Sequence, residues 1–481
     1  MKVAFVSLFR RGHGGGEGRV ALELASHVAE KHEVVMICPA ATTGLVDEQD
    51  DGLRIFGVRS AGAGEFHMPA LSAKAVRAVF DFLDAFGPDV VHAHEPALLG
   101  LIGQVWAKMS VVPFVHTSHV LPGKALEFGA VDALDMKLLQ GSFSESISRR
   151  LLTDFYENCD AIIALNQPAV EAFRRFGYEG RLFVIPNGRD LQRYAACATA
   201  DTDVGQKTLC FIGYISARKN QSYLLEAYRH LPDGYRLLLT GTALNPEYEQ
   251  ALRRYCDVHR LTNVVFTGQV PHEEIPWLLE QTYVFVSASK MEVQSLVVIE
   301  ALASGTPVVG LSNETTDELV DETVGCCLPK LATPEEFAAC VQSICALPQR
   351  AYEKLCENAR QRVSHLDWSN VVEQTIAAYR QLLAEQAPPI TKEKGAVLAD
   401  LISFLPSGEV KDILKERVNR GQRDPASITR PLQGLSLAKR WRVLKRVHGS
   451  TWLLAAGTVV VSLVGYLFMK RRGRQGDQAG G

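Results

Sequence analysis

The chain has 481 residues, which corresponds to two to four domains at the usual domain size. It is 47% hydrophobic and 22% charged, a composition typical of globular proteins and not of disordered chains, collagens or small disulfide scaffolds. The formal net charge of −3 argues against nucleic acid or another highly charged polymer as the partner. The start of the chain, MKVAFVSLF and then RRGHGGGEG, lacks a small-residue cleavage site, so we predict no signal peptide.

Apolar runs of strand length alternate with longer segments of helical period in the first part of the chain. The runs occupy residues 3–9, 33–38, 53–58, 89–94, 113–118, 161–165 and 182–186. Strands of a parallel sheet that are buried on both faces form such continuous runs. We therefore predict a doubly wound α/β domain over residues 1–188.

The same alternation restarts after a polar, alanine-rich stretch at 189–207. We interpret the region near 187–207 as a hinge. Apolar runs follow at 208–215, 235–241, 263–268, 283–289 and 306–311. This predicts a second doubly wound domain over 189–367. A helical segment at 368–386 then ends at two prolines. The predicted fold class is α/β, with two Rossmann-like parallel-sheet domains.

The ten cysteines include no CxxC pair, so zinc ribbons and thioredoxin-type redox sites have no support. Several cysteines, such as Cys38 and Cys210, lie inside apolar runs, and the adjacent Cys326 and Cys327 are a poor disulfide pair. We predict buried, reduced thiols.

The end of the chain is basic, then apolar, then basic again. Residues 387–450 form a predicted linker whose segment 438–448 carries five basic side chains and no acid. Residues 451–469 are mostly apolar and uncharged, and residues 470–481 begin with KRRGR. This pattern predicts a C-terminal transmembrane helix over 451–469. An in-plane anchor or a buried helix are the alternatives.

A glycine-rich loop follows the first predicted strand and opens the first helix, with glycines at 12, 14, 15, 16 and 18. Such a turn lets an anionic ligand approach the backbone at a helix N-terminus. The glycines are more crowded than in a dinucleotide fingerprint, and the second strand ends in Cys38-Pro39 without an acid. A flexible loop that faces an interdomain cleft fits better.

Two histidine clusters follow predicted strands: His92 and His94 in HAHEP, and His116 and His119 in HTSH. Open α/β sheets bind ligands at the carboxyl ends of their strands. Hydrogen bonding to a polar substrate, a metal site and a purely structural role all remain possible here. No further ligand cluster at metal spacing is present, so we predict no metal.

Two charged pairs follow strands of the second domain. Arg218 and Lys219 come after the run at 208–215 and could clamp a diphosphate, although a solvated basic turn is also compatible. Glu292 and Glu300 flank VQSLVVI, directly after the run at 283–289. A helix that begins near Gln294 or Ser295 would point backbone N–H groups at a phosphate.

Together these motifs resemble those of the retaining glycosyltransferases of family 4, which have the GT-B fold. The resemblance covers residues 1–386 and rests on GGGEGR, HAHEP, HTSH, VIPNG, FIGYISARKN and the Glu292–Glu300 segment. It implies two Rossmann-like domains that face an interdomain cleft, with helix 368–386 crossing back to complete the first domain. It also implies a nucleoside-diphosphate sugar as substrate and no cofactor.

For the phosphate-binding side, the resemblance implies that Gly15 and Gly16 face the donor's diphosphate and that Lys219 neutralises it. The backbone N–H groups of Ser295, Leu296 and Val297 would donate to phosphate.

For the sugar and nucleoside, it implies that His119 lies beside the transferred sugar and that Glu292 binds hydroxyl groups near the reacting carbon. Glu300 would hold the ribose, Val270 would meet the base through its backbone, and Asn187 would lie at the interdomain face.

Two positions depart from the family pattern. Tyr214 stands where the family usually has arginine, a loss for which Arg218 could substitute, and Gln294-Ser295 stands where Phe-Gly is usual. Asp201 and Asp203 match a metal-binding D-x-D pattern of a different glycosyltransferase fold, but no strand precedes them, and we interpret them as solvated.

The predicted function is that of a membrane-anchored glycosyltransferase whose acceptor is a membrane lipid such as diacylglycerol or phosphatidylinositol. A transferase for a soluble or polysaccharide acceptor and a non-catalytic nucleotide-sugar-binding membrane protein are the alternatives. Partners would be a nucleotide sugar and the lipid bilayer, not nucleic acid. The protein is expected at the cell membrane, as a single-pass protein with its catalytic domains in the cytoplasm.

Overall fold

The computed structural model describes residues 1–10, 15–40, 46–50, 52–58, 60–63, 66–69, 73–96, 98–122, 152–195 and 206–385. The described residues divide into two compact units: one takes those within 1–117, 153–162 and 379–385, and the other takes those within 118–152 and 163–378. The predicted tail segments from 387 onward, and Asp201 and Asp203, lie outside the described residues. No helix within the described ranges is long and apolar enough to cross a membrane.

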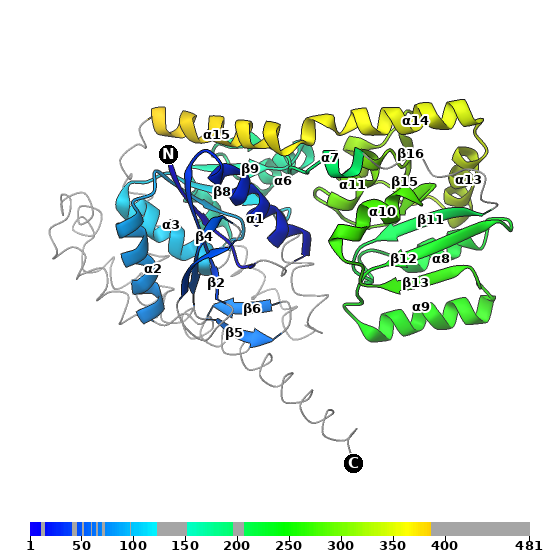
Figure 1. The fold of residues 1–481 in the computed structure, drawn as a ribbon, viewed down its shortest axis with the longest axis horizontal. Helices are drawn as coiled ribbons and strands as arrows, with labels where there is room; N and C mark the ends of the chain where they lie inside the picture. The colour runs from blue at the N-terminus through cyan, green and yellow to red at the C-terminus, as the bar shows by residue number, and fades with distance from the viewer. Residues whose placement is uncertain are drawn as a thin grey trace, which may run out of the picture. The chain divides into compact units, whose positions relative to one another are not determined.

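An eight-stranded sheet is formed by the first part of the chain (Figure 1), with its strands in the order β10-β9-β8-β7-β1-β2-β4-β3. β1 (Lys2–Val6) pairs in parallel with both β2 (Glu33–Pro39) and β7 (Val90–Ala93), so the strand order reverses between β1 and β7. The other strands are β3 (Val46–Asp50), β4 (Leu53–Val58), β8 (Phe114–Ser118), β9 (Ala161–Ala164) and β10 (Leu182–Val184). β5 (Ser60–Ala63) and β6 (Phe66–Pro69) form a separate antiparallel ribbon.

A six-stranded, all-parallel sheet follows, in the order β13-β12-β11-β14-β15-β16. β11 (Lys207–Ile212) lies between β12 (Tyr235–Thr240) and β14 (Val284–Ser287), so the strand order reverses between β11 and β14. Such a reversal is where doubly wound sheets bind ligands. The other strands are β13 (Val264–Gly268), β15 (Val308–Leu311) and β16 (Gly325–Leu328).

Helices connect the strands of both sheets. Those of the first part are α1 (Gly15–Ala29), α2 (Ala73–Phe86), α3 (Leu98–Ser110) and α6 (Gln167–Phe176). Those that follow are α7 (Gln192–Ala195), α8 (Gln221–Tyr228), α9 (Pro246–His259), η1 (His272–Glu274), α10 (Ile275–Glu280), α11 (Leu296–Ser304), α12 (Thr316–Leu319), α13 (Pro334–Cys345), α14 (Gln349–Arg362), η2 (Ser364–Leu366) and α15 (Trp368–Ala384). Local sequence sets their starts: Thr333 and Glu336 form a capping box at α13.

Each predicted apolar run contains a strand, because a run of consecutive apolar residues is what burial of both sheet faces requires. In β11, Leu209 and Phe211 join the core on one face while Cys210 and Ile212 join the core on the other. The runs failed to predict β5 and β6, which form the separate ribbon, and β3 and β16, which lie at the edges of their sheets. The sequence of β3, VDEQD, is polar and mostly exposed, so it carries no apolar signal.

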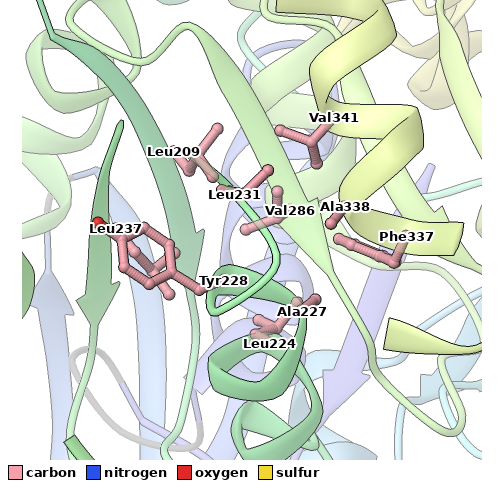
Figure 2. A pocket seen from close by; sticks show the side chains of 10 residues that line it. All are labelled: Leu209, Leu224, Ala227, Tyr228, Leu231, Leu237, Val286, Phe337, Ala338 and Val341. Atoms are coloured by element: carbon pink, nitrogen blue, oxygen red, sulfur yellow. The ribbon is translucent and has the colours of Figure 1, made fainter. Parts of the chain in front are cut away.

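The core between β11, β12, β14 and the helices α8 and α13 encloses a small cavity of about 10 Å³ (Figure 2). Its lining is apolar and includes Leu209, Leu237, Val286 and Phe337. That volume is at the lower limit for a single water molecule, and the lining offers it few hydrogen-bond partners. The cavity is therefore a packing feature of the core and not a ligand site.

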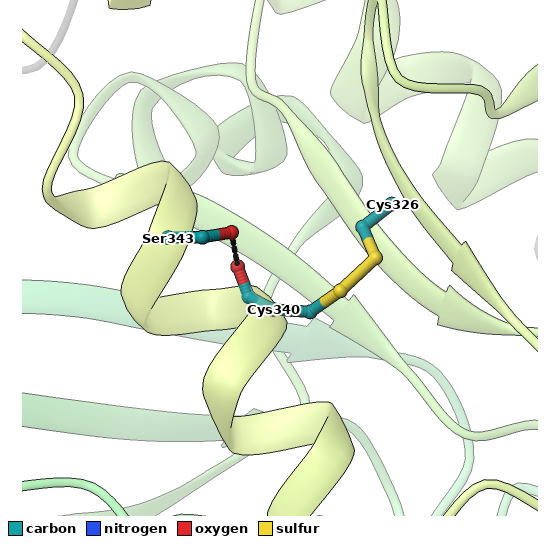
Figure 3. The surroundings of a disulfide bond; sticks show 3 residues. All are labelled: Cys326, Cys340 and Ser343. Carbon is teal, nitrogen blue, oxygen red and sulfur yellow. Dashed lines mark hydrogen bonds between the residues drawn. A yellow bond between two sulfur atoms is a disulfide. The ribbon is translucent and has the colours of Figure 1, made fainter.

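A disulfide joins Cys326 in β16 to Cys340 in α13 (Figure 3). The prediction that the cysteines are reduced thiols is therefore wrong for this pair. The two residues are 14 positions apart and come from different elements, so no local motif indicated that they would meet. Seven free cysteines occur in the described ranges, and all but Cys327 are buried.

Removing this disulfide is expected to destabilise the protein. In the chain-entropy account, a closed loop of about 15 residues contributes roughly 3 kcal/mol. Cys326→Ser/Cys340→Ser should therefore lower the free energy of unfolding by that amount in urea titrations. Dithiothreitol should lower it equally in the wild type and not at all in the double variant. Cys327→Ser is the matched control and should behave as the wild type, and a wild type insensitive to reductant would contradict the prediction.

Candidate active site

The loops after β11 and β14 meet at the point where the strand order of the second sheet reverses. Lys219 Nζ forms an ion pair with Glu292 Oε1, and both side chains are only 11% exposed. A backbone hydrogen bond of 3.0 Å, from Lys290 N to Arg218 O, ties the two loops together. The structure thus brings together Arg218, Lys219 and Glu292, which the sequence placed after two different strands.

Burial and charge act in opposite directions on Glu292. Burial alone would raise the pKa of its carboxyl group, but the charges of Lys219 and Arg218, with hydrogen bonds from Lys219 and Ser289, hold the pKa below its ordinary value. Glu292 is therefore a carboxylate at neutral pH. An ionised carboxylate beside a lysine suits the binding of hydroxyl groups and of an anionic leaving group.

The loop that carries Arg218 and Lys219 is fixed by one buried amide. Gln221 Nε2 donates to Tyr214 O at 2.9 Å, and Gln221 Oε1 accepts from Ser216 N at 3.2 Å. Close packing beside this loop also requires a glycine after β12, because a Cβ on Gly241 would lie 2.0 Å from Gly213 O. Tyr214 thus contributes its backbone carbonyl to the loop, in the position where the resemblance had implied an arginine.

Helix α11 begins at Leu296, close to the predicted start, with Ser295 as its N-cap. Leu296 and Val297 lie in the first turn, where the helix supplies no carbonyl partner for their N–H groups. The N–H group of Ser295 was expected to donate to phosphate, but in the structure it donates to Thr315 Oγ1 at 2.8 Å. Ser295 precedes the helix, so its N–H lies toward the loop after β15 and is bonded there.

Gln294, the second departure from the family pattern, anchors the same loop. Its Oε1 accepts from Asn187 N at 2.6 Å, and its Nε2 donates to Leu165 O at 3.3 Å. Asn166 adds a bond from its Nδ2 to Val293 O at 2.6 Å. A phenylalanine could make none of the bonds of Gln294, so this position has exchanged apolar packing for hydrogen bonds that hold the Glu292 loop.

Glu300 lies inside α11, as predicted, and is 2% exposed. Its Oε1 is 3.1 Å from Arg189 Nε and 3.3 Å from His272 Nε2. Tyr194 Oη also lies 3.3 Å from His272 Nε2. Val270, two residues before His272, is partly buried against the same core. Arg189, His272 and Tyr194 were not predicted as site residues, because only the fold brings them to Glu300.

His119 follows β8 and belongs to the second unit. It is partly buried, and burial lowers the pKa of its imidazole to about 4. Leu121, two residues later, is buried in a cluster with Leu165, Ala169 and Val293. Leu121 and Val293, which follow His119 and Glu292 in the chain, thus belong to one apolar cluster. His119 is a neutral hydrogen-bonding group at physiological pH.

The lowered pKa predicts how His119 affects stability with pH. The unfolded chain takes up a proton on this residue near pH 6.5, whereas the folded chain does so only near pH 4. Because the unfolded state binds more protons in that window, the free energy of unfolding should fall as the pH drops from 6.5 to 4. Urea titrations across this range should show a shallower fall for His119→Gln, and parallel curves would contradict the prediction.

The other predicted histidines are fully buried in the first unit. His92 Nδ1 lies 2.5 Å from Tyr379 Oη, and His92 Nε2 lies 2.7 Å from Thr117 Oγ1. His94 and His116 are also 0% exposed. The burial of these three rings favours their structural interpretation. In the ranges that the structure describes, no three His, Cys, Asp or Glu side chains gather as a metal site requires.

The carboxylate of HAHEP is hydrogen-bonded to the residues directly after β1. Glu95 Oε1 accepts from Ser7 Oγ at 3.0 Å, and Oε2 accepts from Leu8 N at 2.8 Å. These bonds cross the reversal between β1 and β7 in the first sheet. Gly15 is the first residue of α1 and Gly16 is exposed, while Gly12 and Gly14 lie outside the described residues.

Two family models match the chain. One, described as Glycosyltransferase Family 4, matches residues 14–193, and the other, described as Glycosyl transferases group 1, matches residues 199–362. Together the two cover well over half of the chain.

Curated relatives are similar at low identity. An alpha-monoglucosyldiacylglycerol synthase of Streptococcus pneumoniae is 25% identical over 49% of this chain and 54% of its own length, so the chain spans about half of that relative. A D-inositol 3-phosphate glycosyltransferase of Corynebacterium urealyticum is 24% identical over 81% of this chain and 98% of its own length.

Solved structures have the same fold. A sucrose-phosphate synthase of Thermosynechococcus elongatus superposes with a TM-score of 0.64 and 22% identity, over 80% of this chain and 100% of its own. The Anabaena protein Alr3699/HepE, solved in complex with UDP-glucose, gives a TM-score of 0.61 and 18% identity, over 79% of this chain and 100% of its own.

Proposed function

Since the chain belongs to glycosyltransferase family 4, we propose that it transfers a sugar from a nucleoside diphosphate to a hydroxyl group of a membrane lipid, with retention of configuration. The observation that carries this proposal is the ion pair of Lys219 and Glu292 at the strand-order reversal, a few residues before the N-terminus of α11. A cation, a carboxylate and free helix N–H groups in one place match the chemistry of a sugar diphosphate.

Cleavage of the donor's glycosidic bond leaves negative charge on the nucleoside diphosphate. Lys219 and Arg218 would stabilise that charge electrostatically, together with the N–H groups of Leu296 and Val297. Glu292 would accept hydrogen bonds from the hydroxyl groups of the sugar and favour positive charge near the reacting carbon. These groups need no metal to act on the diphosphate.

Retention of configuration requires that the acceptor attack the anomeric carbon from the same face of the sugar from which the leaving group departs. In the proposed reaction the acceptor hydroxyl attacks that face, and the departing phosphate takes its proton. Neutral His119 would contribute a hydrogen bond beside the sugar. Glu292 is already paired with Lys219, which favours a binding role for it over that of a nucleophile.

The lipid acceptor is supported by two observations of different kind. The sequence from 438 to 481 is basic, apolar and basic, as in a juxtamembrane anchor. One curated relative is named as a synthase of a glucosylated diacylglycerol. We propose that residues 451–469 span the membrane, that the catalytic domains are cytoplasmic, where nucleotide sugars occur, and that diacylglycerol or phosphatidylinositol is the acceptor.

The proposal can be tested with the purified full-length protein. Thermal unfolding would be measured with UDP-, ADP- and GDP-sugars, since a ligand of the native state raises the midpoint. The stabilising donor would then be incubated with vesicles that contain diacylglycerol or phosphatidylinositol. A glycolipid product is expected. Transfer to a soluble acceptor alone would overturn the lipid assignment, and binding without turnover would leave a nucleotide-sugar-binding protein.

A further inference from the structure

Arg189 is among the largest fully buried side chains in the described residues, with 2% exposure. A buried guanidinium group needs a compensating partner, and Glu300 supplies it: Arg189 Nε lies 3.1 Å from Glu300 Oε1. Arg189 directly follows the Asn187-Gly188 motif, and nothing in that motif requires a charge at the next position. The buried pair is therefore a feature of this site that its motifs do not explain.

The backbone of Arg189 is fixed independently of its side chain. Its N–H donates to Leu366 O at 2.8 Å, and its carbonyl accepts from Trp368 N at 3.2 Å. Gly188 permits this close approach, because a Cβ there would lie 2.2 Å from Trp368 Cε3. The guanidinium group is also bonded to the backbone of the preceding residue, since Arg189 Nη1 donates to Gly188 O at 3.1 Å. The side chain thus extends toward Glu300 from a rigid base.

Glu300 is surrounded by hydrogen-bonding and charged groups from three elements. Arg189 comes from the segment before α7, Tyr194 from α7 and His272 from η1. Arg193 lies behind His272, with its Nη1 3.4 Å from His272 Nδ1. Arg189 is the one of these groups that is both fully buried and permanently charged. Without it, burial would favour the neutral carboxylic acid at position 300.

We propose that Arg189 is a positioning residue for donor binding: it holds the Glu300 carboxylate ionised and in one orientation, so that this carboxylate can accept hydrogen bonds from the ribose hydroxyl groups of the donor. This inference rests on the proposed function and adds to it a residue that touches Glu300 and not the substrate. Because the ribose is remote from the bond that breaks, loss of Arg189 acts on binding of the nucleoside and only weakly on the chemical step.

The test is a double-mutant cycle on the full-length protein, with UDP, ADP and GDP as probes in calorimetric titrations. Arg189→Met is expected to weaken the nucleotide that the wild type binds by roughly ten- to a hundredfold, as for loss of a hydrogen bond to a charged group. It should raise KM for the donor by the same factor and change kcat by less than about threefold. In a Glu300→Gln background, Arg189→Met should have no further effect on affinity.

The controls separate this role from a purely structural one. Arg189→Lys keeps the charge and should recover part of the nucleotide affinity. If Arg189→Met does not fold, the affinity of Arg189→Lys relative to the wild type still tests the role of the guanidinium group. Arg362→Met removes a surface ion pair with Asp321 and should leave affinity unchanged.

The failures are distinguishable. A wild type that binds none of the nucleotides overturns the proposed function. If the wild type binds a nucleotide and Arg189→Met binds it with equal affinity, the positioning role is overturned. An undiminished effect of Arg189→Met in the Glu300→Gln background would show that Arg189 does not act through Glu300.

Discussion

Replacing Lys219 with alanine is expected to lower kcat for sugar transfer about a hundred- to a thousandfold, the cost of removing one group that stabilises developing charge. Lys219 is the cation paired with Glu292, and only 11% of each side chain is exposed. Because Lys219 is mostly buried, solvent screens its charge only weakly, and this charge acts strongly on the leaving diphosphate. The effect should therefore fall on the chemical step more than on KM.

The same substitution changes Glu292. Charge from Lys219 is the largest of the influences that lower the pKa of this carboxyl against the effect of burial. Without Lys219, the pKa of Glu292 should rise. As the pH is lowered, Glu292 should therefore be protonated earlier, and the residual activity of the variant should begin to fall at a higher pH than the activity of the wild type.

Initial-rate assays over a pH series measure both effects. Lys290→Ala is the matched control, because Lys290 lies in the same loop as Glu292 but its side chain is exposed. Wild-type activity in Lys290→Ala with strong loss in Lys219→Ala is the expected pair of results. A kcat for Lys219→Ala within threefold of the wild type would remove Lys219 from the proposed chemistry.

Breaking the buried pair of Arg189 and Glu300 is expected to have the largest effect on stability. Each side chain is 2% exposed, and removing one partner of such a pair leaves a buried charge uncompensated, at a cost of about 3–5 kcal/mol. Glu300→Gln and Arg189→Met should each lower the free energy of unfolding by an amount in this range. The double variant removes both charges and should recover much of the loss.

Urea titrations of the four proteins supply the cycle, with Arg362→Met as control. The Arg362–Asp321 pair is 29% and 41% exposed, so its loss should cost no more than about 1 kcal/mol. Single variants that lose less than this control, or losses that simply add in the double variant, would contradict the account of a coupled buried pair.

Much of the fold could be predicted because burial of a parallel sheet is visible in the sequence. The runs that contain β11 and β14 are apolar on consecutive residues, and the residues that follow them are charged. Strand ends of a parallel sheet share one edge, so Lys219 and Glu292 could be predicted at the same place. The edge strand β3 was missed because it has almost nothing to bury.

The missed parts of the site depend on contacts between distant residues. Arg189 is 111 positions from Glu300 in the chain, and no local pattern shows that a side chain after Asn187-Gly188 is buried beside α11. Gln294 was visible as a departure from the family, but its bonds to Asn187 and Leu165 were not. The disulfide of Cys326 and Cys340 likewise required the packing of α13 on β16.

The most direct test of the account is transfer from a labelled nucleotide sugar to lipid vesicles by the full-length protein, with the anomeric configuration of the product read by NMR. The expected product is a glycolipid with the configuration of the donor, which Lys219→Ala should form about a hundredfold or more slowly than the wild type. An inverted product, or equal rates for the two proteins, would contradict it.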